Sequence, residues 1–153
     1  MVINGQNYTT RLKEIVESGS RYRIAVIKSD SSASDPNVLN LGLCLAQVIS
    51  KIENDYPRSG TQFQLLVAEA VERIIKDNIT FDRDLGNTVV IDNLGILFES
   101  ELNIDCIDLF NRLSKNVLII LLWHGEMDND FLYFLSKQSQ LRIKQSDINY
   151  III

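Results

Sequence analysis

The sequence has few of the residues that usually mark a catalytic or metal-binding centre. Its 153 residues include one histidine, His124, and two cysteines, Cys44 and Cys106. A lone histidine without a paired base or nucleophile does not make a catalytic constellation. The two cysteines stand far apart among apolar neighbours, which favours reduced, buried thiols over a disulfide or a metal site. Reduced thiols are typical of the cytoplasm, which we expect as the compartment.

The sequence also lacks long hydrophobic runs and an excess of positive charge. The longest apolar run, within 116–123, is far shorter than the ~20 residues that span a bilayer, and the start "MVINGQNYTT" has no leader pattern. The net charge is −5 and the pI is near 4.8. We therefore expect no membrane partner and no strong direct binding to nucleic acid.

Apolar residues recur at helical spacing in four segments. These lie around residues 8–18, 41–52, 61–76 and 104–114. Thr61 and Gln64 have the spacing of a capping box, and Asn103 or Asp105 is suited to cap the last helix. In that last helix we expect Ile107, Phe110 and Leu113 to be buried.

Between the helical segments lie short apolar runs that predict strands, at 23–27, 37–42, 87–92, 116–123 and 149–153. The segment 128–145 fits either a strand or a helix. Buried strands that alternate with helices predict an α/β fold, a mostly parallel sheet with helices on both faces. With 153 residues and no linker, we expect a single domain over 1–153.

Ligands of open parallel sheets bind outside the carboxyl ends of the strands, so the loop after the first core strand is a natural place for a phosphate. Here that loop reads "KSDSSASD". A phosphate cradle needs glycines, whose backbone amides converge on the phosphates, and a lysine. The loop has no glycine, and its lysine stands at the start of the loop, whereas a phosphate loop has it at the end. The aspartates of the loop would repel an anionic phosphate. A standard phosphate site is disfavoured.

Two polar residues follow other apolar strands. Asp92 ends a strand in the way that holds Mg²⁺, usually through water, in P-loop NTPases. A residue that merely caps the next turn fits the pattern equally well. His124 stands where NTPases often place a residue that orients the attacking water, but a partly buried, hydrogen-bonded histidine is the simpler alternative.

Several segments between residues 89 and 125 together resemble the BrxF family, the small P-loop proteins of type 3 BREX bacteriophage-exclusion systems. They are "DNLGILF", "SKN" and "WHG". The resemblance implies a RecA/AAA-like P-loop NTPase fold and a role in antiviral defence. It also implies that Asp92 is the acidic residue of the metal-binding strand, that His124 replaces the polar residue after Trp, and that Lys115 replaces an Arg.

The departures from the family pattern cluster at the expected nucleotide site. The sequence "KSDSSASD" replaces the glycine loop, and the chain before the next strand is too short to hold both the loop and a full helix behind it. Lys115 replaces an arginine and so lacks the planar guanidinium that binds phosphate through two hydrogen bonds. Our first hypothesis is therefore a degenerate, non-catalytic subunit or adaptor that contacts other defence-system proteins in a homo- or hetero-oligomer. No cofactor is expected for it.

A second hypothesis keeps an activity. It is a Mg²⁺-dependent ATP-binding protein or ATPase with a nonstandard loop. Its metal would be held by Ser29, Ser31, Ser32 and Asp92, with water oriented by His124. Lys28 and Lys115 would complete the nucleotide site. A third hypothesis is a small α/β adaptor unrelated to P-loop proteins.

Overall fold

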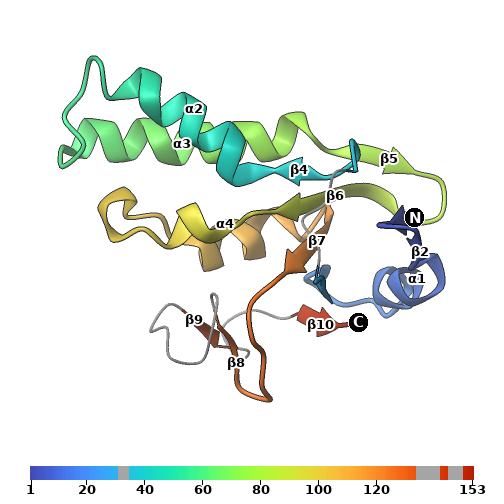
Figure 1. Cartoon of the computed structure of the whole chain (residues 1–153). Helices are drawn as coiled ribbons and strands as arrows, with labels where there is room; N and C mark the ends of the chain where they lie inside the picture. The colour runs from blue at the N-terminus through green and yellow to red at the C-terminus, as the bar shows by residue number, and fades with distance from the viewer. Residues whose placement is uncertain (31–34, 134–141, 145–149) are drawn as a thin grey trace.

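The fold is built on a central parallel sheet, as seen in a computed structural model that describes residues 1–30, 35–133, 142–144 and 150–153 (Figure 1). Five strands are parallel and follow one another across the sheet in the order β10–β3–β7–β6–β4. They are β10 (Tyr150–Ile152), β3 (Ile24–Lys28), β7 (Leu118–Trp123), β6 (Gly86–Asp92) and β4 (Leu39–Asn40). A sixth strand, β5 (Thr80–Asp82), pairs antiparallel with β6. The predicted α/β fold with a mostly parallel sheet is confirmed.

Both faces of the sheet are covered, which explains why its strands are continuous apolar runs. On one face Val26, Ile91 and Leu121 pack into a large core with the helices α2 (Leu41–Ile52), α3 (Thr61–Asp77) and α4 (Cys106–Leu113). On the other face Ile27, Val90 and Ile120 pack against the helix α1 (Thr9–Glu17). The unequal layers are visible in Figure 1, where α2 and α3 run side by side.

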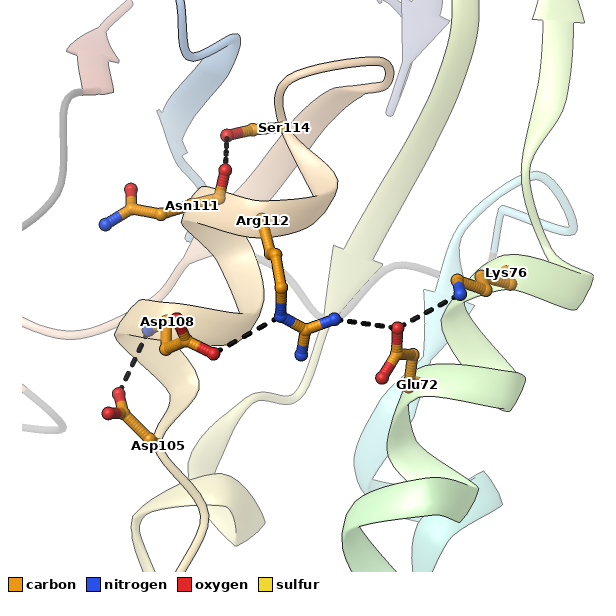
Figure 2. Close-up of polar contacts among 7 residues, drawn as sticks. All are labelled: Glu72, Lys76, Asp105, Asp108, Asn111, Arg112 and Ser114. Carbon is orange, nitrogen blue, oxygen red and sulfur yellow. Dashed lines mark hydrogen bonds and ion pairs between the residues drawn. The ribbon is translucent and has the colours of Figure 1, made fainter.

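The helices begin and end close to the predicted positions. Helix α1 is followed by Gly19 at φ +71°, the left-handed conformation that glycine adopts easily. Asp105 caps α4 by accepting a hydrogen bond from the Asp108 amide (Figure 2). In α4, Phe110 is buried as predicted, whereas Ile107 and Leu113 are only partly buried, because the face of the helix that packs into the core is formed by Cys106, Leu109 and Phe110.

The predicted capping box is wrong. Gly60 is the N-cap of α3, and no side chain caps that helix. The Gln64 amide instead donates a hydrogen bond to the backbone oxygen of Glu101, 3.1 Å away in the short 3₁₀ segment η2 (Ser100–Leu102) that follows η1 (Gly95–Phe98). The Gln64 side chain thus contacts a segment distant in the sequence and does not cap the start of its own helix.

Two small hairpins were not predicted. The strands β1 (Val2–Ile3) and β2 (Gln6–Asn7) flank Asn4 and Gly5, both at positive φ, and β5 turns back into β6 at Gly86. Asn-Gly is a strong hairpin signal that the sequence offered. In the ambiguous tail, β8 (Phe131–Tyr133) pairs antiparallel with β9 (Arg142–Lys144), and residues 134–141 lie outside the described part. The last predicted strand is present as β10.

Both cysteines are free, and Cys106 is buried while Cys44 is half-buried. Burial, with a smaller contribution from the nearby Asp105 carboxylate, raises the pKa of the Cys106 thiol from 9.0 to about 11. In the described part of the chain, none of the helices is long and apolar enough to cross a membrane.

The buried thiol predicts selective alkylation. Because the thiolate is the nucleophile, the raised pKa alone should slow the reaction of native Cys106 with iodoacetamide at pH 8 by roughly a hundredfold relative to the unfolded chain. Cys44 is the internal control, since it is only half-buried. Mass spectrometry of the alkylated peptides measures both rates. Equal rates at the two cysteines in the native protein would contradict the burial.

Candidate functional site at the carboxyl edge of the sheet

Three neighbouring strands bring several of the polar residues that the sequence analysis singled out to one edge of the sheet. Lys28, the last residue of β3, pairs in register with Trp123, the last residue of β7. On the other side of β7, Leu121 pairs with Ile91, directly before Asp92. Because the strands are parallel, Ser29, His124 and Asp92 all follow at the carboxyl edge, where ligands of such sheets bind.

The side chains at this edge form a continuous bridge. His124 Nε2 lies 2.6 Å from Asp92 Oδ1, and His124 Nδ1 lies 2.8 Å from the backbone oxygen of Ser29. The backbone amide of Asn93 donates a second hydrogen bond, of 2.7 Å, to the same Asp92 oxygen. The bridge thus ties together the ends of β6, β7 and β3.

The geometry of the bridge indicates the proton arrangement. A backbone oxygen only accepts, so His124 Nδ1 donates to Ser29. Nε2 faces the carboxylate of Asp92, which is only 6% exposed and also accepts from the Asn93 amide. Asp92 is therefore engaged by groups of the protein itself.

Two further contacts fix the surrounding loops. Lys28 Nζ donates to the backbone oxygen of Gly125 over 2.8 Å, which links the loop after β3 to the loop after β7. The Asn93 side chain donates to Asn40 Oδ1 over 2.9 Å, and Asn40 also caps α2. Asn93 is at φ +57° and lies against Gly42, so closely that a Cβ atom there would meet it.

Most of the predicted site residues are brought together. Lys28, Ser29, Asp92 and His124 all lie at this edge. Ser31 and Ser32 lie outside the described residues. Lys115 precedes β7, at the opposite end of a six-residue strand from His124, which corresponds to a separation of about 20 Å. The structure does not bring Lys115 into the site.

Several residues of the edge were not predicted. They are Asn40, Asn93, Gly42 and Asn4, whose side-chain amide lies 3.5 Å from Ser29 Oγ. The Asn-Gly pair at positions 4 and 5 is a hairpin signal that would have indicated a turn at Asn4, but it does not show which strand the turn approaches. The pairing of Asn40 with Asp92 depends on the β4–β6 register, which has no local signature.

The contacts at this edge join strand ends and loops of the protein to one another. Among the described residues, no group of three or more His, Cys, Asp or Glu side chains is placed to hold a metal ion. Mg²⁺ prefers oxygen ligands, but Asp92 Oδ1 already has two donors. Beside the edge, a hollow of about 220 Å³ is bordered by Lys28, Ser29 and the β1–β2 hairpin.

Comparison of the chain with protein-family models, with curated proteins and with solved structures finds no match.

Proposed function

We propose that this protein is a non-hydrolysing subunit or adaptor that acts through protein contacts in a bacterial anti-phage defence assembly of the BREX kind. The observation that supports the non-hydrolysing part is the contact made by Asp92 Oδ1. This oxygen of the carboxylate that would serve Mg²⁺ is held by His124 Nε2 and by the backbone amide of Asn93. The defence role rests on the resemblance of residues 89–125 to the BrxF family, and the partners would be other defence-system proteins in the cytoplasm.

The order of the strands supports a RecA/AAA-like sheet. In the RecA/AAA-like sheet that the resemblance implies, three strands are neighbours. The middle strand ends at the Trp and the polar residue after it. On one side lies the strand that precedes the phosphate loop, and on the other the strand that ends in the metal-binding Asp. In this chain β3 and β6 flank β7 in that way, and all three are parallel. The sheet is therefore compatible with descent from a P-loop NTPase.

The connection after β3 supports the loss of nucleotide turnover. Only residues 29–38 separate β3 from β4, and the stretch contains no glycine. Backbone amides need glycines to converge on a phosphate, and a helix behind the loop normally adds its N-terminal amides. These ten residues are fewer than a phosphate loop and a full helix behind it together need.

A second candidate function is Mg²⁺-dependent ATP binding or hydrolysis by a nonstandard loop. It is favoured by the gathering of Lys28, Ser29, Asp92 and His124 at the edge where sheet ligands bind. In that function Asp92 would have to exchange His124 for the metal, and Ser29 would supply a hydroxyl.

Thermal denaturation with and without Mg²⁺-ATP and Mg²⁺-ADP separates the two functions. A ligand at ~100 times its dissociation constant adds about 2.7 kcal/mol, a shift of several degrees for a domain of this size. We expect no shift at millimolar nucleotide, and no phosphate release above that of the Asp92→Ala variant. A shift that is lost in Asp92→Ala but kept in Asp55→Ala, an exposed control, would establish the second function instead.

A further inference from the structure

The turn of the β1–β2 hairpin is formed by Asn4 and Gly5, an exposed pair near the start of the sequence. Both residues are in the left-handed region, at φ +51° and +79°. Nothing lies within 4 Å of the position that a Cβ atom of Gly5 would take. In the described part of the chain, the Gly5 amide nitrogen donates no hydrogen bond. The backbone nitrogen of Gly5 is therefore accessible and not engaged by the fold.

The Asn4 side chain makes a weak contact with the loop after β3. Its amide nitrogen Nδ2 lies 3.5 Å from Ser29 Oγ, at the long end of hydrogen-bond distances. The backbone nitrogen that follows an asparagine can bond to the side-chain carbon Cγ, which closes a ring of five atoms. A following glycine favours this closure, because it has no Cβ to crowd the nitrogen and its backbone rotates freely. The pair of Asn4 and Gly5 is thus suited to this ring closure.

Other asparagines of this chain share the backbone conformation of Asn4 and differ in the residue that follows. Among the described residues, the non-glycine residues at positive φ are Asn4, Asn93 and Asn103. Asn93 is followed by the buried Leu94, and its side chain is hydrogen-bonded. Asn103 is exposed like Asn4, but the β-branched Ile104 after it crowds the backbone nitrogen. The sequence contains no second Asn-Gly pair, so Asn4 is distinguished by its neighbour and not by its own conformation.

We propose that Asn4 is a site of spontaneous deamidation, a covalent modification that needs no enzyme. The ring closes during brief openings of the turn, which a hairpin with two-residue strands allows. The Gly5 nitrogen bonds to Asn4 Cγ and loses its proton, while the Cγ–Nδ2 bond breaks and the amide leaves as ammonia. Water then adds to one of the two carbonyl carbons of the resulting succinimide and opens it. Attack at Cγ gives aspartate, and attack at the main-chain carbonyl carbon gives isoaspartate.

The two products affect the carboxyl edge of the sheet differently. Aspartate keeps the length of the main chain and adds a negative charge beside Ser29, at the hollow that Lys28 also borders. Isoaspartate adds one atom to the main chain within a two-residue turn, so the pairing of Ile3 with Gln6 is lost. Ile3 is 2% exposed and packs into the core on the α1 face of the sheet. The isoaspartyl form therefore weakens the attachment of the hairpin to that core.

Incubation of the purified full chain in mildly alkaline buffer, followed by peptide mass spectrometry at successive times, tests the proposal. We expect the change from amide to acid, together with the isoaspartyl product, first at Asn4, and a severalfold slower conversion of Asn103. The Asn4→Gln variant would have to close a six-membered ring and should show no product at this position. Conversion of Asn103 as fast as Asn4 would overturn the proposal. So would an unmodified Asn4 in the native protein under conditions in which the urea-denatured chain reacts there.

Thermal denaturation of the separated products measures the effect on the hairpin. Ion-exchange and hydrophobic-interaction chromatography isolate the isoaspartyl form, which should melt about 2–4 °C below the unmodified chain because part of the Ile3 packing is lost. Freshly prepared Asn4→Asp carries the same charge on a main chain of normal length. This variant should melt close to the unmodified chain, as exposed substitutions usually do. An isoaspartyl form as stable as the unmodified chain would overturn the coupling between the turn and the core.

Discussion

Replacing Asp92 by alanine is expected to lower the free energy of unfolding by about 1–3 kcal/mol, the range for a buried hydrogen-bonded group whose partners are charged or buried. The carboxylate is 6% exposed and accepts from both His124 Nε2 and the Asn93 amide. Alanine would leave both donors without an acceptor. Urea denaturation of the two proteins measures the difference.

The partner variant sharpens this prediction. His124→Ala should cost less than Asp92→Ala, since 38% of the His124 side chain is exposed and water can replace it. The double variant should show a coupling energy of about 1 kcal/mol, because the two residues share one hydrogen bond. Asp55→Ala serves as a matched control at an exposed position.

The sign of the Asp92 effect bears on the function. A carboxylate kept ready for a metal is commonly destabilising, so its removal leaves stability unchanged or raises it. A carboxylate that joins strand ends is stabilising. If Asp92→Ala proved as stable as the natural chain, the bridge would contribute nothing, and the Mg²⁺-dependent alternative would become the better explanation of the site.

Replacing Gly42 by alanine is expected to destabilise the protein by about 1–2 kcal/mol, although alanine is the better helix former. Helix propensity alone predicts a gain of up to about 1 kcal/mol in α2. A Cβ at this position would lie 2.6 Å from Asn93 Cγ and 2.9 Å from the Asn93 backbone oxygen. Overpacking of this kind costs about 1–3 kcal/mol, and a backbone neighbour cannot move away cheaply.

Two companion variants make the Gly42 prediction specific. Ser50→Ala, at an exposed position of the same helix, should be neutral or slightly stabilising. Asn93→Gly in the Gly42→Ala background should recover part of the loss, because glycine accepts the φ of +57° and removes the side-chain overlap. A Gly42→Ala variant more stable than the natural protein would show that α2 and Asn93 separate easily. Thermal denaturation followed by circular dichroism measures all three variants.

Local patterns determined most elements of this fold before any tertiary contact was known. The three-four spacing from Phe63 to Ile75 produced α3, and the fully apolar runs produced β7 and β6, because each pattern matches the geometry of a buried face. The alternation of these elements then determined a parallel sheet. Asp92 and His124 were predicted at strand ends for the same reason, since a polar residue after a buried run marks the edge of the sheet.

Only the tertiary structure decided what these residues contact. Asp92 and His124 meet because β6 and β7 are neighbours in register, and Lys115 is remote because it precedes β7. Gln64 contacts Glu101 rather than capping α3, and Arg112 joins Glu72 across two helices. Sequence periodicity reports which face a residue occupies within its own element. Contacts between distant elements depend on strand order, register and helix docking, which arise from the packing of the whole core.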